Sequence, residues 1–431
     1  MHLNKESWRN KMSTQQYKAW SVVTASTIAF TVCFMIWMMF AVIGIPIKKM
    51  LSLNETQFGL LIAMPVLTGS LIRLPLGMWT DKFGGRIVFF VLMMSTVLPI
   101  WMISQATEYW HFLVTSLFVG VAGGSFTVGI AYCARWFPKQ RQGLAMGIFG
   151  AGNTGAAVTK LVAPLIIVAY GTWTMVPQIY AGIMLVTAVL FWLFTFSDKS
   201  HVVGSHVTIR EQLMVLKDPK VWRYSQYYSI VFGGYVALAL WMTKYYMSEY
   251  QFELKDAAML AATFSIPGGM LRAVGGWFSD KFGAHTMTWW VLWISLVCLF
   301  FLSYPQTSFT ILTVTGPATF HIGLGPTMFT IIMFTMGIVF AIGKASVFKY
   351  ISDDYPKNIG VVSGVVGLAG GMGGFLMPIM FGALVDFTGV RSSAFMLMFG
   401  IVWVSLMWMY FTEVHPLHVE KENTKGAHGA L

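Results

Sequence analysis

Residues 69–84 read GSLIRLPLGMWTDKFG, and residues 268–283 read GGMLRAVGGWFSDKFG. Glycine, arginine, aspartate, lysine and phenylalanine recur in the two stretches at a constant offset of 199 positions. The repeat predicts a chain built from two related halves, with the functional site expected at their interface.

The composition of the chain around this repeat excludes an ordinary soluble domain. Of the 431 residues, 56% are hydrophobic and 10% are charged, whereas soluble domains carry about 25% charged residues. So much apolar surface requires lipid as part of the solvent. The net charge of +11 does not indicate a nucleic-acid partner, because the basic residues lie in short loops between apolar segments.

Apolar stretches long enough to cross a bilayer recur along the whole chain. We therefore predict an all-α membrane protein with twelve transmembrane helices in two six-helix halves, residues 1–196 and 221–431. A polar linker, residues 197–220, separates them, and Tyr304–Thr327 is an insertion of unassigned structure. The predicted spans are Ala19–Ile47, Thr56–Thr80, Ile87–Ser104, Tyr109–Trp136, Gln142–Tyr170, Val176–Phe196, Val221–Glu249, Lys255–Ser279, Thr286–Ser303, Met328–Ile351, Asn358–Phe387 and Arg391–Phe411.

Lysine and arginine also predict the orientation. With the N-terminus inside, the cytoplasmic segments hold 19 basic residues and the outer segments 5. By the positive-inside rule both termini are cytoplasmic. The polar, basic N-terminal segment is not a cleavable signal peptide. Among the loop charges, we expect Asp81 and Arg86 to latch the cytoplasmic side.

Four basic residues fall inside predicted spans: Arg73, Lys160, Arg272 and Lys344. An intramembrane arginine is costly and usually pairs with an acid, but all 17 acidic residues map to loops or helix ends. Since arginine keeps its proton, Arg73 and Arg272 need a counter-ion from outside the protein. The transported species is therefore predicted to be an anion, and the planar guanidinium fork suits a planar oxyanion.

The two lysines leave two interpretations open. The flexible stem of Lys344 could carry its ammonium to the headgroups, whereas Lys160 lies nearer the middle of its span. A buried lysine can release its proton near neutral pH. We expect one of them to couple anion entry to a proton.

Glycines form dense stripes on the fifth and eleventh predicted helices. Such stripes allow close helix packing, and their density here also predicts sliding of helices or close approach of backbone to a ligand. The residues assigned to this gating role are Gly143, Gly147, Gly150, Gly152, Gly364, Gly367, Gly370 and Gly371.

Residues 77–86, GMWTDKFGGR, resemble the loop signature between helices 2 and 3 of the major facilitator superfamily. The glycine-rich helices, with the two arginines, resemble its nitrate/nitrite porters (NarK-like). The resemblance implies that Arg73 and Arg272 clamp the anion, that Tyr228 and Asn153 are donors, and that Phe126 and Phe232 flank the flat ion. Lysines at positions 160 and 344 suggest the branch proposed to import nitrate with protons.

These observations predict a bacterial inner-membrane symporter that imports nitrate, with nitrite as a second substrate, by alternating access in nitrate assimilation. A nitrate/nitrite antiporter, an oxalate or formate transporter of the same fold, and an anion channel are the alternatives. We expect no enzyme activity, because no catalytic motif is present, and no cofactor or metal, because the nine histidines form no ligand-like cluster. The expected partners are the anion, protons and membrane lipids, and the expected state is a monomer.

Overall fold

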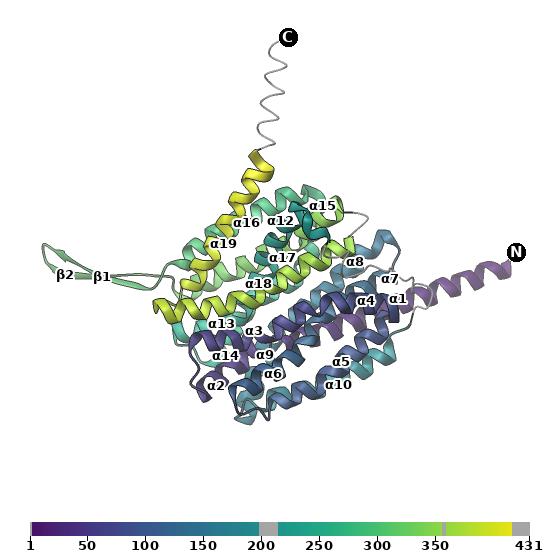
Figure 1. The fold of residues 1–431 in the computed structure, drawn as a ribbon, viewed down its shortest axis with the longest axis horizontal. Helices are drawn as coiled ribbons and strands as arrows, with labels where there is room; N and C mark the ends of the chain where they lie inside the picture. Colours follow the sequence, from purple (N-terminus) through teal and green to yellow (C-terminus); the bar gives the residue numbers. More distant parts are fainter. Residues whose placement is uncertain (1, 198–213, 356–358, 416–431) are drawn as a thin grey trace, which may run out of the picture.

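The computed structural model describes residues 2–197, 214–355 and 359–415, and it is a bundle of long, roughly parallel helices (Figure 1). The predicted linker falls largely outside these residues. The N-terminal half contains α1 (His2–Trp37), α2 (Phe40–Met50), α3 (Glu55–Leu71), α4 (Arg73–Phe83), α5 (Gly85–Ile103), α6 (Tyr109–Gly120), η1 (Val121–Gly124), α7 (Ser125–Arg135), α8 (Lys139–Gly150), η2 (Ala151–Thr154), α9 (Gly155–Tyr170) and α10 (Met175–Phe194).

The C-terminal half has the same plan with one insertion. It contains η3 (Val215–Lys217), α12 (Pro219–Tyr228), η4 (Ser229–Gly234), α13 (Tyr235–Tyr250), α14 (Leu254–Met270), α15 (Arg272–Phe282), α16 (Ala284–Ser303), β1 (Thr307–Thr313), β2 (Gly316–Ile322), α17 (Pro326–Asp354), α18 (Ile359–Thr388), α19 (Ser393–Met409) and η5 (Tyr410–Val414). We call the side where α1 begins and α19 ends the terminal face, and the opposite side, which carries β1 and β2, the hairpin face.

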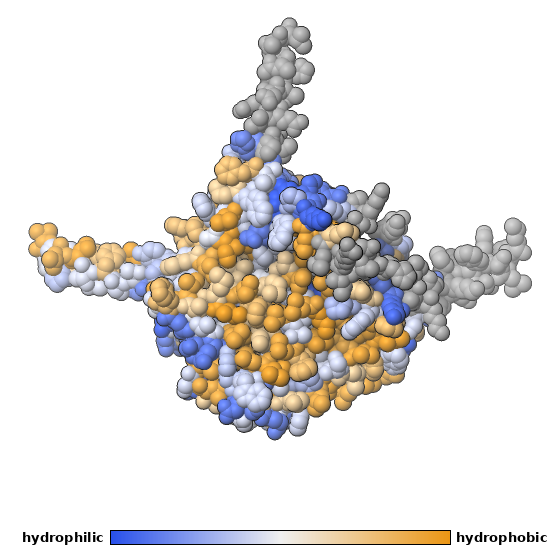
Figure 2. All heavy atoms as spheres, viewed as in Figure 1, coloured by the Kyte–Doolittle hydropathy of each residue, from blue (hydrophilic) through white to orange (hydrophobic). Residues whose placement is uncertain are grey.

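The helices are long and apolar enough for a multi-pass membrane protein. Within the described residues, nine helices could cross a membrane by length and composition, or eleven if each of two bent pairs is one span. The helical run from Pro219 to Tyr250 would complete the predicted twelve. Apolar side chains cover much of the flank of the bundle, and polar ones gather toward its ends (Figure 2).

The sequence repeat is also a structural repeat. Helices α3 and α4 meet at a bend of 41°, and α14 and α15 meet at a bend of 47°. Each pair ends at a glycine with positive φ, +85° at Gly84 and +84° at Gly283, a conformation that favours glycine. The two spans predicted as continuous, Thr56–Thr80 and Lys255–Ser279, are therefore each bent, at Ile72 and Leu271.

The halves meet along α3 with α18 and along α9 with α14. At the hairpin face the contact is polar: Lys244 on α13 pairs with Glu55 at the start of α3, and the Asp386 carboxylate on α18 accepts hydrogen bonds from the backbone N–H groups of Glu55 and Thr56. At the terminal face, small residues of the two halves pack closely against each other. For example, a Cβ on Gly147 would lie 3.2 Å from the Cβ of Ala273.

The insertion at Tyr304–Thr327 forms an antiparallel hairpin, β1 with β2, which extends beyond the bundle (Figure 1). Cross-strand bonds such as Thr310 to Thr319 line one side of it.

The expected latch between Asp81 and Arg86 is wrong. Arg135 on α7 pairs with Asp81 instead, and Arg86 donates to the backbone oxygen of Trp192 on α10.

Candidate functional site

Arg73 is the first residue of α4, directly after the bend at Ile72. It is buried, with 4% of its surface exposed. Its Nη1 donates to the backbone oxygen of Gly367 on α18 at 3.1 Å, so the side chain reaches from the N-terminal half into the C-terminal half.

Arg272 occupies the equivalent position in the other half, as the first residue of α15 after the second bend. Its Cδ lies 3.4 Å from the place that a Cβ on Gly150 would take, so it reaches toward the N-terminal half. The two arginines thus cross the interface between the halves in opposite directions. Each lies against a glycine of the partner half, Gly367 for Arg73 and Gly150 for Arg272.

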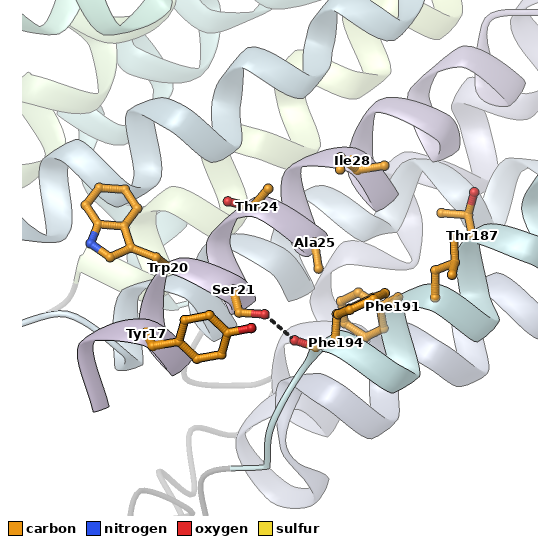
Figure 3. Close-up of a pocket in the computed structure, with 10 residues that line it drawn as sticks. Tyr17, Trp20, Ser21, Thr24, Ala25, Ile28, Thr187, Phe191 and Phe194 are labelled. Atoms are coloured by element: carbon orange, nitrogen blue, oxygen red, sulfur yellow. Dashed lines mark hydrogen bonds between the residues drawn. The ribbon is translucent and has the colours of Figure 1, made fainter. Parts of the chain in front are cut away.

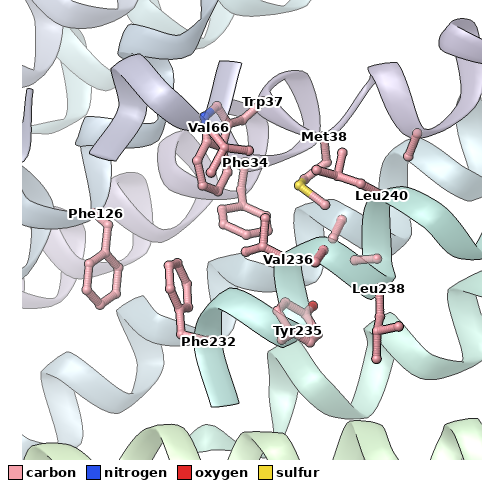
Figure 4. Packing of buried hydrophobic residues seen from close by; sticks show 14 of the residues in the cluster. Phe34, Trp37, Met38, Val66, Phe126, Phe232, Tyr235, Val236, Leu238 and Leu240 are labelled. Carbon is pink, nitrogen blue, oxygen red and sulfur yellow. The ribbon is translucent and has the colours of Figure 1, made fainter. Parts of the chain in front are cut away.

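Aromatic rings surround the two guanidinium groups, and one of them, Phe126, lies close to both. The Cζ atoms of Arg73 and Arg272 lie 5.8 Å and 5.0 Å from the centroid of the Phe126 ring. Arg73 also lies over Phe232, at 5.1 Å, and Arg272 over Phe348, at 5.1 Å. Tyr228 connects the ring beside Arg73 with the second ring beside Arg272, because it packs on both Phe232 and Phe348. Figure 4 shows Phe126 and Phe232 lying next to each other.

Most of these residues lie at or beside an irregular turn. Asn153 lies in the 3₁₀ turn η2, and Phe126 is the second residue after the 3₁₀ turn η1. Tyr228 directly precedes the π-helical turn η4, which contains Phe232. Departures from α-helical hydrogen bonding are common at functional sites. Together with the two bends, they place the site where backbone geometry is least regular.

Unpaired polar atoms converge on this region. Within the described residues, four buried side-chain atoms of the predicted site have no hydrogen-bond partner: Arg73 Nε, Arg272 Nη1, Tyr228 Oη and Asn153 Oδ1. Buried polar groups are normally paired, and leaving one unpaired costs about 1–3 kcal/mol. Three of the four are donors. The arrangement is therefore suited to bind a small acceptor such as an oxyanion.

Asn153 differs from the expected donor in one respect. Its Nδ2 already donates to the oxygen of Gly150 at 3.0 Å, and its unpaired atom is the acceptor Oδ1. Since the amide NH2 group has two N–H donors, the second can donate to an anion while the first stays on the Gly150 oxygen.

The predicted glycines divide into two groups. Gly367 and Gly150 face the arginines, and Gly370 packs so closely that an added Cβ would lie 2.4 Å from Cδ1 of Tyr228. Gly371 packs on Ser70 across the halves, and Gly364 approaches Leu74. By contrast, Gly152 packs on α1 within its own half, and Gly147 meets Ala273 nearer the terminal face. Gly143 lies in the first turns of α8.

The two lysines lie apart from the ring of aromatic side chains, and both contact α14. Lys160 on α9 is fully buried, and its Nζ donates to Ser265 Oγ and approaches the Ala261 oxygen at 3.5 Å. Lys344 on α17 is also fully buried, and its Nζ donates to the Gly268 oxygen at 2.6 Å. The ammonium of Lys344 therefore does not extend to a membrane surface.

Charge is unbalanced at the site. Of the ion pairs among the described residues, none includes Arg73, Arg272, Lys160 or Lys344. Desolvated cations are unfavourable unless an opposite charge or good acceptors surround them. An anion that enters between the arginines would supply the missing charge.

A groove of about 480 Å³ lies elsewhere, between α1 and α10 on the flank of the bundle (Figure 3). It is lined by Trp20, Ile28, Phe191 and other mainly apolar residues, without a charged side chain. Ser21 donates across it to the Phe194 oxygen at 2.6 Å. Nothing in this lining suits an inorganic anion.

Sequence reasoning missed Phe348, the second ring beside Arg272. Its signal was weak, because a phenylalanine in a span is usually a packing residue. The one available indication is its position four residues after Lys344, on the same face of α17. Ser265 and Tyr235, which surround the lysines, were missed as well, since nothing in their local sequence marks them.

Comparisons with known proteins bear on the family of the chain. The family model described as Major Facilitator Superfamily matches residues 25–336. The chain is 37% identical over 416 residues to a probable nitrate/nitrite antiporter NarK1 of Thermus thermophilus, covering 94% of both chains. It is 28% identical to the nitrite extrusion protein of Bacillus subtilis, covering 93% of this chain and 97% of that one.

Other similarities point the same way. The chain is 29% identical to a probable nitrate transporter NarT of Staphylococcus carnosus, covering 93% and 96% of the two chains. Among solved structures, a bacterial homologue of the human lysosomal transporter Spinster, inward-facing and occupied, superposes with a TM-score of 0.69. That match covers 92% of this chain and 96% of that one at 16% identity, so it bears on the fold alone.

Proposed function

Because the chain belongs to the Major Facilitator Superfamily, and within it to the NarK-like nitrate/nitrite porters, we propose that it imports nitrate across the bacterial inner membrane together with protons. Arg73 and Arg272 bind the anion, and the two halves rock around it so that the site opens to one side at a time. Both termini face the cytoplasm in this proposal, as the basic loops indicate.

The observation that carries the proposal is the set of unpaired donors between the halves. Arg73 Nε, Arg272 Nη1 and Tyr228 Oη lack partners within the described residues, and nitrate offers one oxygen to each. Since the two arginines come from different halves, an anion bound by both would favour the state in which the halves are together.

Shape supports the choice of a planar ion. Phe126 and Phe232 lie beside the guanidinium group of Arg73, and in this proposal the flat ion binds between the two rings. A tetrahedral sulfate or phosphate would meet the ring faces. Nitrite fits the same space but has one oxygen fewer for the three donors.

Proton coupling is the less direct part of the proposal. It is supported by Lys160 and Lys344, which are fully buried ammonium groups outside any ion pair among the described residues. A lysine in such surroundings can exchange its proton at physiological pH, and an anion carried with a proton moves without net charge. Exchange of nitrate for nitrite remains the second candidate, because the Thermus relative is named as an antiporter.

Transport into proteoliposomes tests the proposal. Vesicles without internal anion should accumulate nitrate when the outside is made acidic, and internal nitrite should not be required. Uptake that needs internal nitrite and ignores the pH gradient would show an exchanger instead. Stronger competition by oxalate or formate than by nitrite would show a carboxylate transporter.

A further inference from the structure

Four fully buried side chains surround the middle of α14 and play no part in the arginine site. Two are Lys160 and Lys344, and the others are Ser265 on α14 and Tyr235 on α13. The Tyr235 hydroxyl donates a hydrogen bond to the backbone oxygen of Ser265 at 3.1 Å. The Lys344 ammonium lies 3.6 Å from the centroid of the Tyr235 ring.

The two lysines differ in which half supplies their acceptors. Lys160 lies on α9, in the N-terminal half, whereas Ser265 and Ala261 lie on α14, in the C-terminal half. Lys344 lies on α17 and binds the Gly268 oxygen, which belongs to its own half. Only the Lys160 contact therefore crosses the interface that must change in alternating access.

We propose that Lys160 is the group that takes up and releases the coupled proton, and that Ser265 is the residue that positions its ammonium while the halves are together. The proposal rests on the proton coupling advanced above. The acceptor and the aromatic neighbour of Lys344 both belong to its own half, so we expect it to keep them as the halves move and to serve as a fixed support beside the bend that carries Arg272.

The assignment to Lys160 follows from the way in which the charge of a buried ammonium depends on its hydrogen-bond acceptors. Away from water, a charged lysine is stabilised only by the groups that it touches. When α9 and α14 separate, Lys160 loses Ser265 and Ala261 together, and its proton passes to water that enters between the helices. A group can couple to a conformational change only if the two states bind the proton differently. Lys160 meets that condition because its acceptors lie on the opposite half, whereas the acceptor of Lys344 lies in its own half.

Neighbouring titratable groups do not replace these acceptors. The helices packed against α9 are α14, α1, α10 and α2. Their titratable side chains in the described part of the chain include Cys33 on α1, Tyr180 on α10, Lys48 and Lys49 at the end of α2, and Lys255 and Asp256 at the start of α14. Tyr180 bonds to Thr159, Lys48 pairs with Glu55, and the Lys160 ammonium bonds to α14.

The test separates coupling from transport in the full-length protein reconstituted in liposomes. Two rates are measured for each variant: nitrate counterflow without a pH gradient, and uphill nitrate accumulation driven by one. For Lys160→Gln, the ratio of driven accumulation to counterflow should fall at least about tenfold. Lys160→Arg should lower this ratio to a similar extent, because its guanidinium keeps its proton. Lys160→His should restore part of the coupling.

Two further variants supply the contrast. Lys344→Gln should change both rates together and leave their ratio within about twofold, as expected of a support. Ser265→Ala removes the hydroxyl acceptor but no charge, and it should shift the pH dependence of counterflow. A purely structural effect of Ser265 would lower the rate at every pH without moving the profile.

Failure of the inference can be distinguished from failure of the proposed function. If the wild-type protein accumulates nitrate with the pH gradient while Lys344→Gln uncouples it and Lys160→Gln does not, the assignment of the proton to Lys160 is overturned. If the wild-type protein shows counterflow but no driven accumulation, proton coupling itself is overturned, and the inference with it.

Discussion

Arg73 donates a hydrogen bond from Nη1 to the backbone oxygen of Gly367, 3.1 Å away on the opposite half of the protein. The partner is a backbone oxygen of α18, and a Cβ on Gly367 would lie 3.6 Å from the same nitrogen, an ordinary van der Waals distance. The bond uses one part of the guanidinium and leaves Nε unpaired among the described residues. Arg73 can therefore hold the other half and still offer a donor to an anion.

Replacing either arginine by lysine should abolish nitrate transport. An ammonium group cannot present a planar fork to an oxyanion, and at position 73 it would also have to replace the bond to Gly367. Loss of two charge-assisted hydrogen bonds predicts a fall in uptake on the order of 100-fold or more, measured in proteoliposomes at subsaturating nitrate. The matched control is Arg391→Lys, since Arg391 is half-exposed and pairs with Glu249 at the hairpin face; near-normal uptake by Arg73→Lys would contradict the assignment.

Gly370→Ala should impair transport through Tyr228. The new methyl group would lie 2.4 Å from the Tyr228 ring, and overpacking of this kind costs about 1–3 kcal/mol. We expect weaker nitrate binding, seen as a higher KM, and a lower melting temperature. Gly182→Ala on α10 is the control, because nothing lies within 4 Å of its Cβ position. Equal behaviour of the two variants would show that Gly370 is not a contact of the site.

Phe348→Leu should weaken anion binding although no sequence motif marks this residue. Its ring lies 5.1 Å from the Arg272 Cζ and packs edge-on against Tyr228, so its loss frees both side chains. A cation–π contact of about 0.5–2 kcal/mol predicts a rise in KM of roughly 2- to 30-fold. Phe301→Leu, at an exposed position on α16, should leave KM unchanged. An unaltered KM in Phe348→Leu would exclude its ring from the site.

Asp386→Asn should favour opening at the hairpin face. The Asp386 carboxylate accepts bonds from the Glu55 and Thr56 N–H groups, at 3.0 Å and 2.8 Å, and so caps α3 across the halves. Losing the charge of a cap costs about 1 kcal/mol, or roughly fivefold in the equilibrium. Maleimide labelling of a cysteine placed at Val66, where α3 meets Gly374 of α18, reports the opening.

The labelling experiment has a low background, because the native residues Cys33, Cys133 and Cys298 are all buried. Labelling at position 66 should be faster with Asn than with Asp at position 386, and Asp386→Glu should restore part of the protection. If all three proteins react at the same rate, Asp386 does not hold this face closed.

Several features of the fold could be predicted from the sequence because they depend only on what kinds of residue occur and how often. Run lengths of apolar residues predict helices that span a bilayer, and the offset repeat around Arg73 and Arg272 predicts two related halves. The lack of acidic residues inside the spans predicts that an anion must balance the arginines. None of these inferences depends on which helices pack against each other.

Other features depend on how segments far apart in the chain pack against each other. The bends at Ile72 and Leu271, and the closure of Phe348 onto Arg272, have no local sequence signature that separates them from ordinary helix and core. The hairpin in the insertion was equally unassigned.

The amino-acid sequence by itself determined that this protein lies in lipid, that it is made of two copies of one plan, and that it carries buried positive charge without acids to match. Only the tertiary structure decided which partners those charges have: Gly367 of the opposite half for Arg73, Ser265 of the opposite half for Lys160, and Gly268 of its own half for Lys344. The reason is physical. Burial and charge follow from composition along one segment, whereas the acceptor that a buried cation finds depends on how separate helices pack against each other.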